Sequence, residues 1–285
     1  MTAVMSLTTI MTMPVRTYAD EVEKPYLSLG ADLNKEEKAR VLNLLGVRED
    51  RLSDYELVTI TNADEHEYLD NYLNASIIGS RALSSVLIEK KSKGNGIRVT
   101  TKNITYCTEG MYQNALSTAG ITDADITVAG PFNLTGTAAL VGAMKAYEDM
   151  TGEEIEETLK DAATNELVVT GDLAEEIGGS EQAEELIAML KEFIAEHDNP
   201  TDEEMEEAIR QGEEQLDITL TEDQKEQIME LMKKIDDLDL DVDQLKEQAK
   251  AIYEKITDLE GLEKESQGFI QMIKGWFEKI FGMFG

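Results

Sequence analysis

Cys107 is the only thiol of this chain, and it is the first candidate for nucleophilic chemistry. A catalytic cysteine needs a nearby base that takes its proton. Neither of the two histidines is close to it in sequence, and His66 could approach it only through the fold. A lone cysteine after a predicted strand is more typical of a small apolar core residue. No Ser-His-Asp set, Walker loop or dinucleotide fingerprint occurs, so we expect no cofactor.

Two acidic stretches have part of the spacing that metal sites use. The run at 64–67, Asp-Glu-His-Glu, lacks the second histidine of a zinc-protease helix, and we interpret it as a solvated first helical turn. Alternating aspartates at 237–243 resemble a calcium loop. However, Val242 and Gln248 replace the glycine and glutamate that such a loop needs. We predict no metal centre; weak calcium association stays open beside a loop that caps the next helix.

Polar side chains gather around the middle strands and the second helix of the predicted core. The run at 135–137, Thr-Gly-Thr, opens a helix whose first amides suit an anion or a carboxylate. We expect a binding site for a glycan, a peptide or a small anion, with ordinary capping and strand-edge hydrogen bonds as the alternative. The residues assigned to this site are Arg81, Ser84, Ser85, Asn103, Thr105, Tyr112, Thr135 and Thr137, and Thr108 and Asn114 belong to the same polar set.

The last 18 residues, Gly268–Gly285, carry the sharpest functional signal. They contain four of the six Phe and the only Trp, and they have a net charge of +1 in a chain of -33. Their apolar residues recur at helical spacing, which favours a helix that lies in a membrane interface rather than one that spans it. Docking into a groove of its own helices or of a partner is the alternative. The expected contact residues are Phe269, Ile273, Trp276, Phe277, Ile280, Phe281 and Phe284.

The elements that must position these residues follow from periodicity. Alternating segments at 56–61, 81–91, 96–101 and 125–129 predict strands, and helices are expected at 63–73 and 108–120. The turn at 93–96 is expected to join a hairpin, and Gly130-Pro131 to end the last strand. The order β-α-β-β-α-β predicts an α+β fold with a ferredoxin-like core. Further helices are expected at 34–45 and 135–150.

The rear of the chain is strongly acidic and predicted to be helical. Residues 153–285 hold 39 acidic and 12 basic side chains. We interpret the acids as solvated helix faces, with cation buffering or repulsion of anionic polymers as the alternative. A pI near 4.3 argues against a nucleic-acid partner. Thr201 and Thr221 are expected N-caps, and the helices are predicted at 152–165, 172–178, 180–197, 201–215, 221–236 and 242–260.

The first 19 residues resemble a signal peptide. Residues 1–13 are uncharged, and Pro14 and a small-residue approach to Ala19 precede Asp20. No basic segment precedes them, so the true start of the chain could lie upstream. An apolar N-terminus on a cytosolic protein is the alternative. We therefore divide the chain into a leader (1–19), an α/β core (30–178), an acidic helical region (179–265) and an amphipathic tail helix (266–285).

Several segments resemble one family in register. They are Thr59–Glu65, Arg81–Val86, Lys102–Thr105, Met111–Ile121 and Thr135–Leu140. Together they resemble the YpuA-like family of Gram-positive bacteria, a domain of unknown function with the number one thousand and two. The likeness covers roughly residues 30–178 and, more loosely, 220–256. It implies an exported protein and no reaction, and Cys107 departs from the apolar residue expected at its position.

These patterns predict a secreted or extracytoplasmic protein that binds or interacts in the cell envelope without catalysis. The tail is expected to hold it at the outer face of the cytoplasmic membrane or on a partner protein. An envelope hydrolase, or a glycan- or peptide-binding enzyme, is the alternative; it requires Arg81, Ser85, Asn103 and Tyr112 to converge in one concave pocket. A tail that only joins copies of the chain is a third hypothesis.

Overall fold

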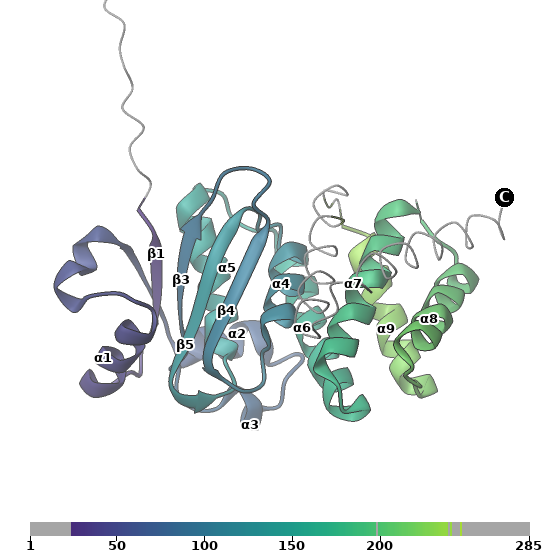
Figure 1. The fold of residues 1–285 in the computed structure, drawn as a ribbon, viewed down its shortest axis with the longest axis horizontal. Helices are drawn as coiled ribbons and strands as arrows, with labels where there is room; N and C mark the ends of the chain where they lie inside the picture. Colours follow the sequence, from purple (N-terminus) through teal and green to yellow (C-terminus); the bar gives the residue numbers. More distant parts are fainter. Residues whose placement is uncertain (1–23, 198, 239, 241–245, 247–285) are drawn as a thin grey trace, which may run out of the picture.

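The computed structural model describes residues 24–197, 199–238, 240 and 246. The predicted leader and tail, and all of the helix expected at 242–260 except Lys246, lie outside the described residues. Five strands form one mixed sheet in the order β2-β1-β3-β5-β4 (Figure 1). The strands are β1 (Tyr26–Gly30), β2 (Glu56–Ile60), β3 (Ser85–Lys90), β4 (Ile97–Ile104) and β5 (Ala124–Leu134).

Helices cover both faces of this sheet. On one face α1 (Lys35–Leu44), followed by the short 3-10 helix η1 (Glu49–Asp54), packs on β1 and β5 through an apolar cluster. On the other face lie α4 (Glu109–Thr118) and α5 (Thr137–Thr151). Two shorter helices, α2 (Asn62–Leu69) and α3 (Ala75–Ile78), pack beside α5.

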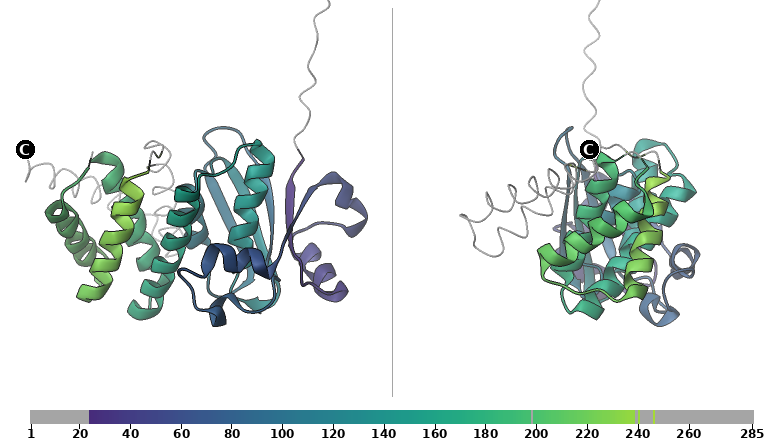
Figure 2. Two further views of the ribbon diagram at one scale, coloured as in Figure 1. Left: turned by 180° about the vertical axis from the view of Figure 1, so that it is seen from behind. Right: turned by 90° about the vertical axis from the view of Figure 1, so that its right-hand side faces the viewer.

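Four further helices extend the molecule away from the sheet (Figures 1 and 2). They are α6 (Glu157–Ile177), α7 (Ser180–Glu196), α8 (Asp202–Leu216) and α9 (Glu222–Asp236). The last three confirm the helices predicted at 180–197, 201–215 and 221–236, and Thr201 and Thr221 form capping boxes as expected. Within the described residues, no helix combines the length and apolarity that crossing a membrane requires.

The α+β class is confirmed, but the ferredoxin-like arrangement is wrong. The strands predicted at 81–91 and 96–101 do not form a hairpin, because β5 lies between them and pairs antiparallel with β3 and parallel with β4. An unpredicted strand, β1, lies between β2 and β3. Each end of the sheet therefore closes with a parallel strand-helix-strand crossover, β1-α1-β2 and β4-α4-β5.

Two predicted boundaries are also wrong. Strand β5 continues through Pro131 to Leu134, because the register with β4 shifts between Lys102 and Ile104 and Pro131 falls where no partner is paired. The helices predicted at 152–165 and 172–178 are one continuous helix, α6. Gly171, within it, is buried against Tyr106, so tertiary packing overrides the low helix propensity of this stretch.

Helix α6 joins the sheet layer to the outer helices. Its residues belong both to the core under the sheet and to the core between α7, α8 and α9. A buried ion pair reinforces this contact: Lys191 Nζ lies 2.9 Å from Glu166 Oε1, and Thr118 donates a hydrogen bond to the same carboxylate. From α9, Lys234 donates hydrogen bonds of 2.9 Å to Tyr72 and to Asp161.

Candidate functional site

A pocket of about 270 Å³ opens beside the first turn of α5. It lies where the segment after α3, the start of β3 and the loop between β5 and α5 meet. Four of the eight residues assigned to the site from sequence line it: Arg81, Ser84, Thr135 and Thr137. Apolar walls come from neighbours of these residues and from α3. The fold therefore brings together half of the predicted set.

A carboxyl group that the sequence interpretation placed in solvent lies in this pocket. Glu65 is only 1 % exposed, and it accepts hydrogen bonds from Thr137 Oγ1 at 2.8 Å and from Asn62 Nδ2 at 3.3 Å. Burial raises the pKa of Glu65 above its ordinary value, and these hydrogen bonds oppose the rise. The prediction of a solvated turn at 64–67 is wrong at this position because α2 packs against α5.

Helical spacing could have indicated that Glu65 faces inward. It lies four residues before Leu69, which is fully buried, and eight before Leu73. Residues at this spacing share one face of a helix. The neighbouring Asp64 has a different role, because it accepts hydrogen bonds from Thr61 and Lys145 and ties α2 to α5. These bonds outweigh burial and lower the pKa of Asp64 to about 2.

The first turn of α5 already faces a carboxyl group of its own chain. Its N-cap, Gly136, has no side chain and a φ of 102°. A Cβ here would overlap Tyr112 and Ile104, so the position requires glycine. Ser84 Oγ accepts a hydrogen bond of 2.9 Å from the amide of Ala139. The carboxyl group of Glu65 therefore already lies beside this helix end, and binding of a further anion there stays a prediction.

Arg81 is the one cation among the lining residues, and it is engaged. Its Nη2 donates to Glu37 Oε2 at 2.6 Å and to the carbonyl of Asp32 at 2.8 Å. The bond from Arg81 lowers the pKa of Glu37. The pocket thus offers a buried carboxyl, hydroxyl groups and apolar walls, but no free positive charge among its lining residues.

The other four predicted residues have structural contacts elsewhere. Ser85 is buried in β3 and accepts a hydrogen bond from the amide of Gly30. Asn103 and Thr105 are exposed and bond to carbonyls of the β5 segment. Tyr112 is 1 % exposed and donates to the carbonyl of Gly136 at 2.6 Å. None of these four lines the pocket.

The remaining candidates for catalysis or metal binding, Cys107 and the acidic stretch around His66, have structural surroundings that account for them. Cys107 is buried, and burial raises the pKa of its thiol to about 12, so the thiolate that a nucleophile needs is strongly disfavoured. His66 Nδ1 lies 2.5 Å from Asp70 Oδ1, and this contact raises the pKa of the imidazole. In the described part of the chain, no group of three or more metal-ligating side chains comes together.

The fold and this pocket define an α+β protein with one mixed sheet, helices on both faces and a small cavity of polar and apolar lining beside α5. Comparison with known proteins then places it. A family described as "Protein of unknown function (DUF1002)" matches residues 29–252, and the chain belongs to this family. It is 39% identical over 260 residues to the uncharacterized protein YpuA of Bacillus subtilis (strain 168), covering 90% of this chain and 86% of that protein. No solved structure matches the chain.

Proposed function

We propose that this protein is an exported, non-enzymatic binding protein of the cell envelope, with its ligand site in the pocket beside α5. The observation that carries the proposal is the meeting of Arg81, Ser84, Thr135 and Thr137 around the buried carboxyl of Glu65. Buried acids with a raised pKa are found more often in the cavities of functional sites than elsewhere in proteins.

The chemistry of the pocket favours a ligand rich in hydrogen-bond donors. Glu65 and the hydroxyls of Ser84 and Thr135 can accept hydrogen bonds, while Arg81 is held by Glu37 and Asp32. A volume of about 270 Å³ is slightly below the range of about 300–1,000 Å³ for sites that hold drug-sized ligands. The pocket therefore suits one sugar ring or one side chain of a longer glycan or peptide.

The enzyme alternative finds less support in this geometry. It required Arg81, Ser85, Asn103 and Tyr112 to converge, and of these only Arg81 lines the pocket. Glu65 is the single carboxyl among the lining residues, whereas glycoside hydrolysis ordinarily uses two.

Calorimetric titration of the full chain with cell-wall glycan fragments and with short peptides tests the pocket. We expect binding to one of these classes that weakens at least tenfold in a Thr137→Val variant, which removes the hydroxyl beside Glu65. Thr105→Val is the matched control, because Thr105 is exposed and outside the pocket. Equal affinity of the two variants, or binding to neither ligand class, would refute the site.

Export and the position at the membrane are tested separately. We expect the chain in the envelope fraction of its cell, with an N-terminus at Asp20 after removal of residues 1–19. The tail residues Phe269 to Phe284 are proposed to hold it at the outer face of the cytoplasmic membrane. A chain with an intact leader found in the cytosol would refute export, and equal vesicle binding by a chain that ends at Ser266 would refute the membrane contact.

A further inference from the structure

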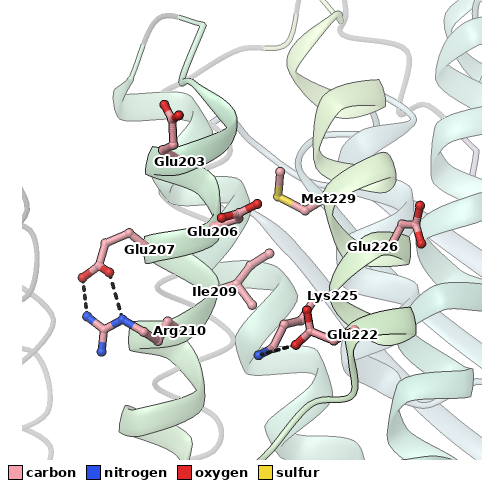
Figure 3. A pocket seen from close by; sticks show the side chains of 9 residues that line it. All are labelled: Glu203, Glu206, Glu207, Ile209, Arg210, Glu222, Lys225, Glu226 and Met229. Carbon is pink, nitrogen blue, oxygen red and sulfur yellow. Dashed lines mark hydrogen bonds and ion pairs between the residues drawn. The ribbon is translucent and has the colours of Figure 1, made fainter.

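A groove of about 650 Å³ runs between α8 and α9, at the end of the molecule far from the sheet (Figures 1 and 3). Figure 3 shows Glu206, Ile209 and Met229 in the space between the two helices. Ile209 is buried and Met229 is partly exposed, so the floor of the groove is apolar. Its volume lies within the range of about 300–1,000 Å³ found for ligand sites.

The charges around this floor are unbalanced. Arg210 and Lys225 are the two cations that line the groove, and both are engaged: Arg210 with Glu207 and Glu214, Lys225 with Glu213 and Glu222. Three more carboxylates line it and are exposed. Glu203, Glu206 and Glu226 have no ion-pair partner among the residues that the structure describes. A segment with an apolar face and positive charges would complement this groove.

The C-terminal segment of the same chain has that chemistry. Gly268–Gly285 carries Lys274 and Lys279 against the single Glu278, and it holds the only Trp of the protein. Its residues Phe269, Ile273, Trp276 and Phe277 recur at i, i+4, i+7 and i+8, the spacing of anchors that occupy a groove.

The chain is long enough to reach the groove. Lys246 is the last residue that the structure describes. Its Nζ lies 3.0 Å from Oε1 of Glu196, so this point of the chain lies beside the end of α7. The 21 residues between 246 and 268 span up to roughly 70 Å when extended.

We propose that the groove between α8 and α9 receives the C-terminal segment 268–285 of its own chain. The apolar face of this segment cannot be buried in the groove and in a lipid surface at the same time. The groove and the membrane therefore compete for it, and this part of the inference rests on the membrane contact proposed above. If the segment is in the groove nine-tenths of the time, its apparent affinity for vesicles is about tenfold lower.

Trp276 reports the docking directly, because it is the only indole of the chain. The full chain without lipid is expected to show blue-shifted Trp276 emission that acrylamide quenches poorly. Reversing the charges of the groove with Glu203→Lys, Glu206→Lys and Glu226→Lys should shift the emission to the red and increase quenching several-fold. Adding Lys274→Glu and Lys279→Glu to that variant should restore the protection.

A matched control changes the net charge equally. Glu36→Lys, Glu49→Lys and Glu67→Lys replace three exposed glutamates of the sheet layer and should leave the emission of Trp276 unchanged. The groove variant should also bind vesicles of phosphatidylcholine and phosphatidylglycerol about tenfold more tightly than this control. Circular dichroism of each variant checks that its helices are intact.

Four results would overturn the proposal. The first is equal Trp276 emission in the groove variant and the control, and the second is that adding Lys274→Glu and Lys279→Glu fails to protect Trp276 from acrylamide. The third is protection of Trp276 that disappears on dilution, which indicates docking to a second copy. The fourth is protection that appears only when vesicles are present. Absence of vesicle binding by every variant would refute the membrane contact. The Trp276 emission measured without lipid would then still test whether the segment docks in the groove.

Discussion

Replacing Lys191 by methionine removes one half of the buried ion pair that joins α7 to α6. The side chains of Lys191 and Glu166 are 4% and 0% exposed, and Nζ and Oε1 lie 2.9 Å apart. Lys191 also donates to the carbonyl of Asn114 at 2.9 Å. Burial lowers the pKa of Lys191, although Glu166 opposes this shift. The pair therefore compensates two charges that have been withdrawn from water.

The cost of breaking this pair follows from what is left behind. In Lys191→Met the Glu166 carboxylate stays buried, with the hydroxyl of Thr118 as its remaining donor. Removing one partner of a buried pair costs about 3–5 kcal/mol, since the other charge is left uncompensated. That is a large part of the roughly 5–15 kcal/mol by which folded proteins are stable. Methionine keeps most of the apolar stem, so the loss reports the charge.

Urea unfolding followed by far-ultraviolet circular dichroism measures this effect on the helices. The double variant Lys191→Met/Glu166→Leu removes both charges, and we expect it to recover most of the lost stability, because apolar replacement of a buried pair is often neutral. A free energy of unfolding of Lys191→Met within about 1 kcal/mol of that of the parent protein would refute the reasoning. So would a double variant no more stable than Lys191→Met.

Three further substitutions test the surroundings of the pocket. Asp64 has a pKa of about 2 in the folded protein against 3.8 when unfolded, so its stabilising contribution is complete above pH 3.8 and is lost as the pH falls towards 2. Asp64→Asn should therefore flatten the acid side of a curve of unfolding free energy against pH. The pKa of Glu65 is raised in the folded protein, so its contribution to stability is lost as the pH rises through that folded-state pKa. Glu65→Gln should remove this decrease in stability when urea midpoints are compared across pH. Gly30→Ala should cost about 1–3 kcal/mol in urea unfolding, because its Cβ would overlap the backbone of Ala82.

Each of these expectations has a result that contradicts it. An Asp64→Asn curve parallel to that of the parent would mean that its bonds to Lys145 and Thr61 do not persist in solution. A Glu65→Gln variant that keeps the parent's loss of stability at rising pH would place that titration on another group. Parent-like stability of Gly30→Ala would mean that β1 does not approach the segment before β3 as closely as described.

The outer helices show how far local signals reach. The expected N-caps Thr201 and Thr221 placed the starts of α8 and α9 to within about a residue, since a cap acts on amides two or three residues away. Four of the eight residues assigned to a binding site line one pocket, and two of them, Thr135 and Thr137, lie at the predicted start of α5. Ligand binding by these residues stays a prediction. Glu65 was missed, although its spacing from Leu69 placed it on the buried face.

The sequence alone determined features that depend on neighbours along the chain: most helices, the caps at Thr201 and Thr221, the strand at β2, the acidic surface and the family resemblance. The tertiary structure alone decided that β5 lies between β3 and β4, that β1 completes the sheet, and that Lys191 meets Glu166. Strand pairing and burial depend on which distant segments come together. The period of a segment gives its inward face but not the partner that covers it.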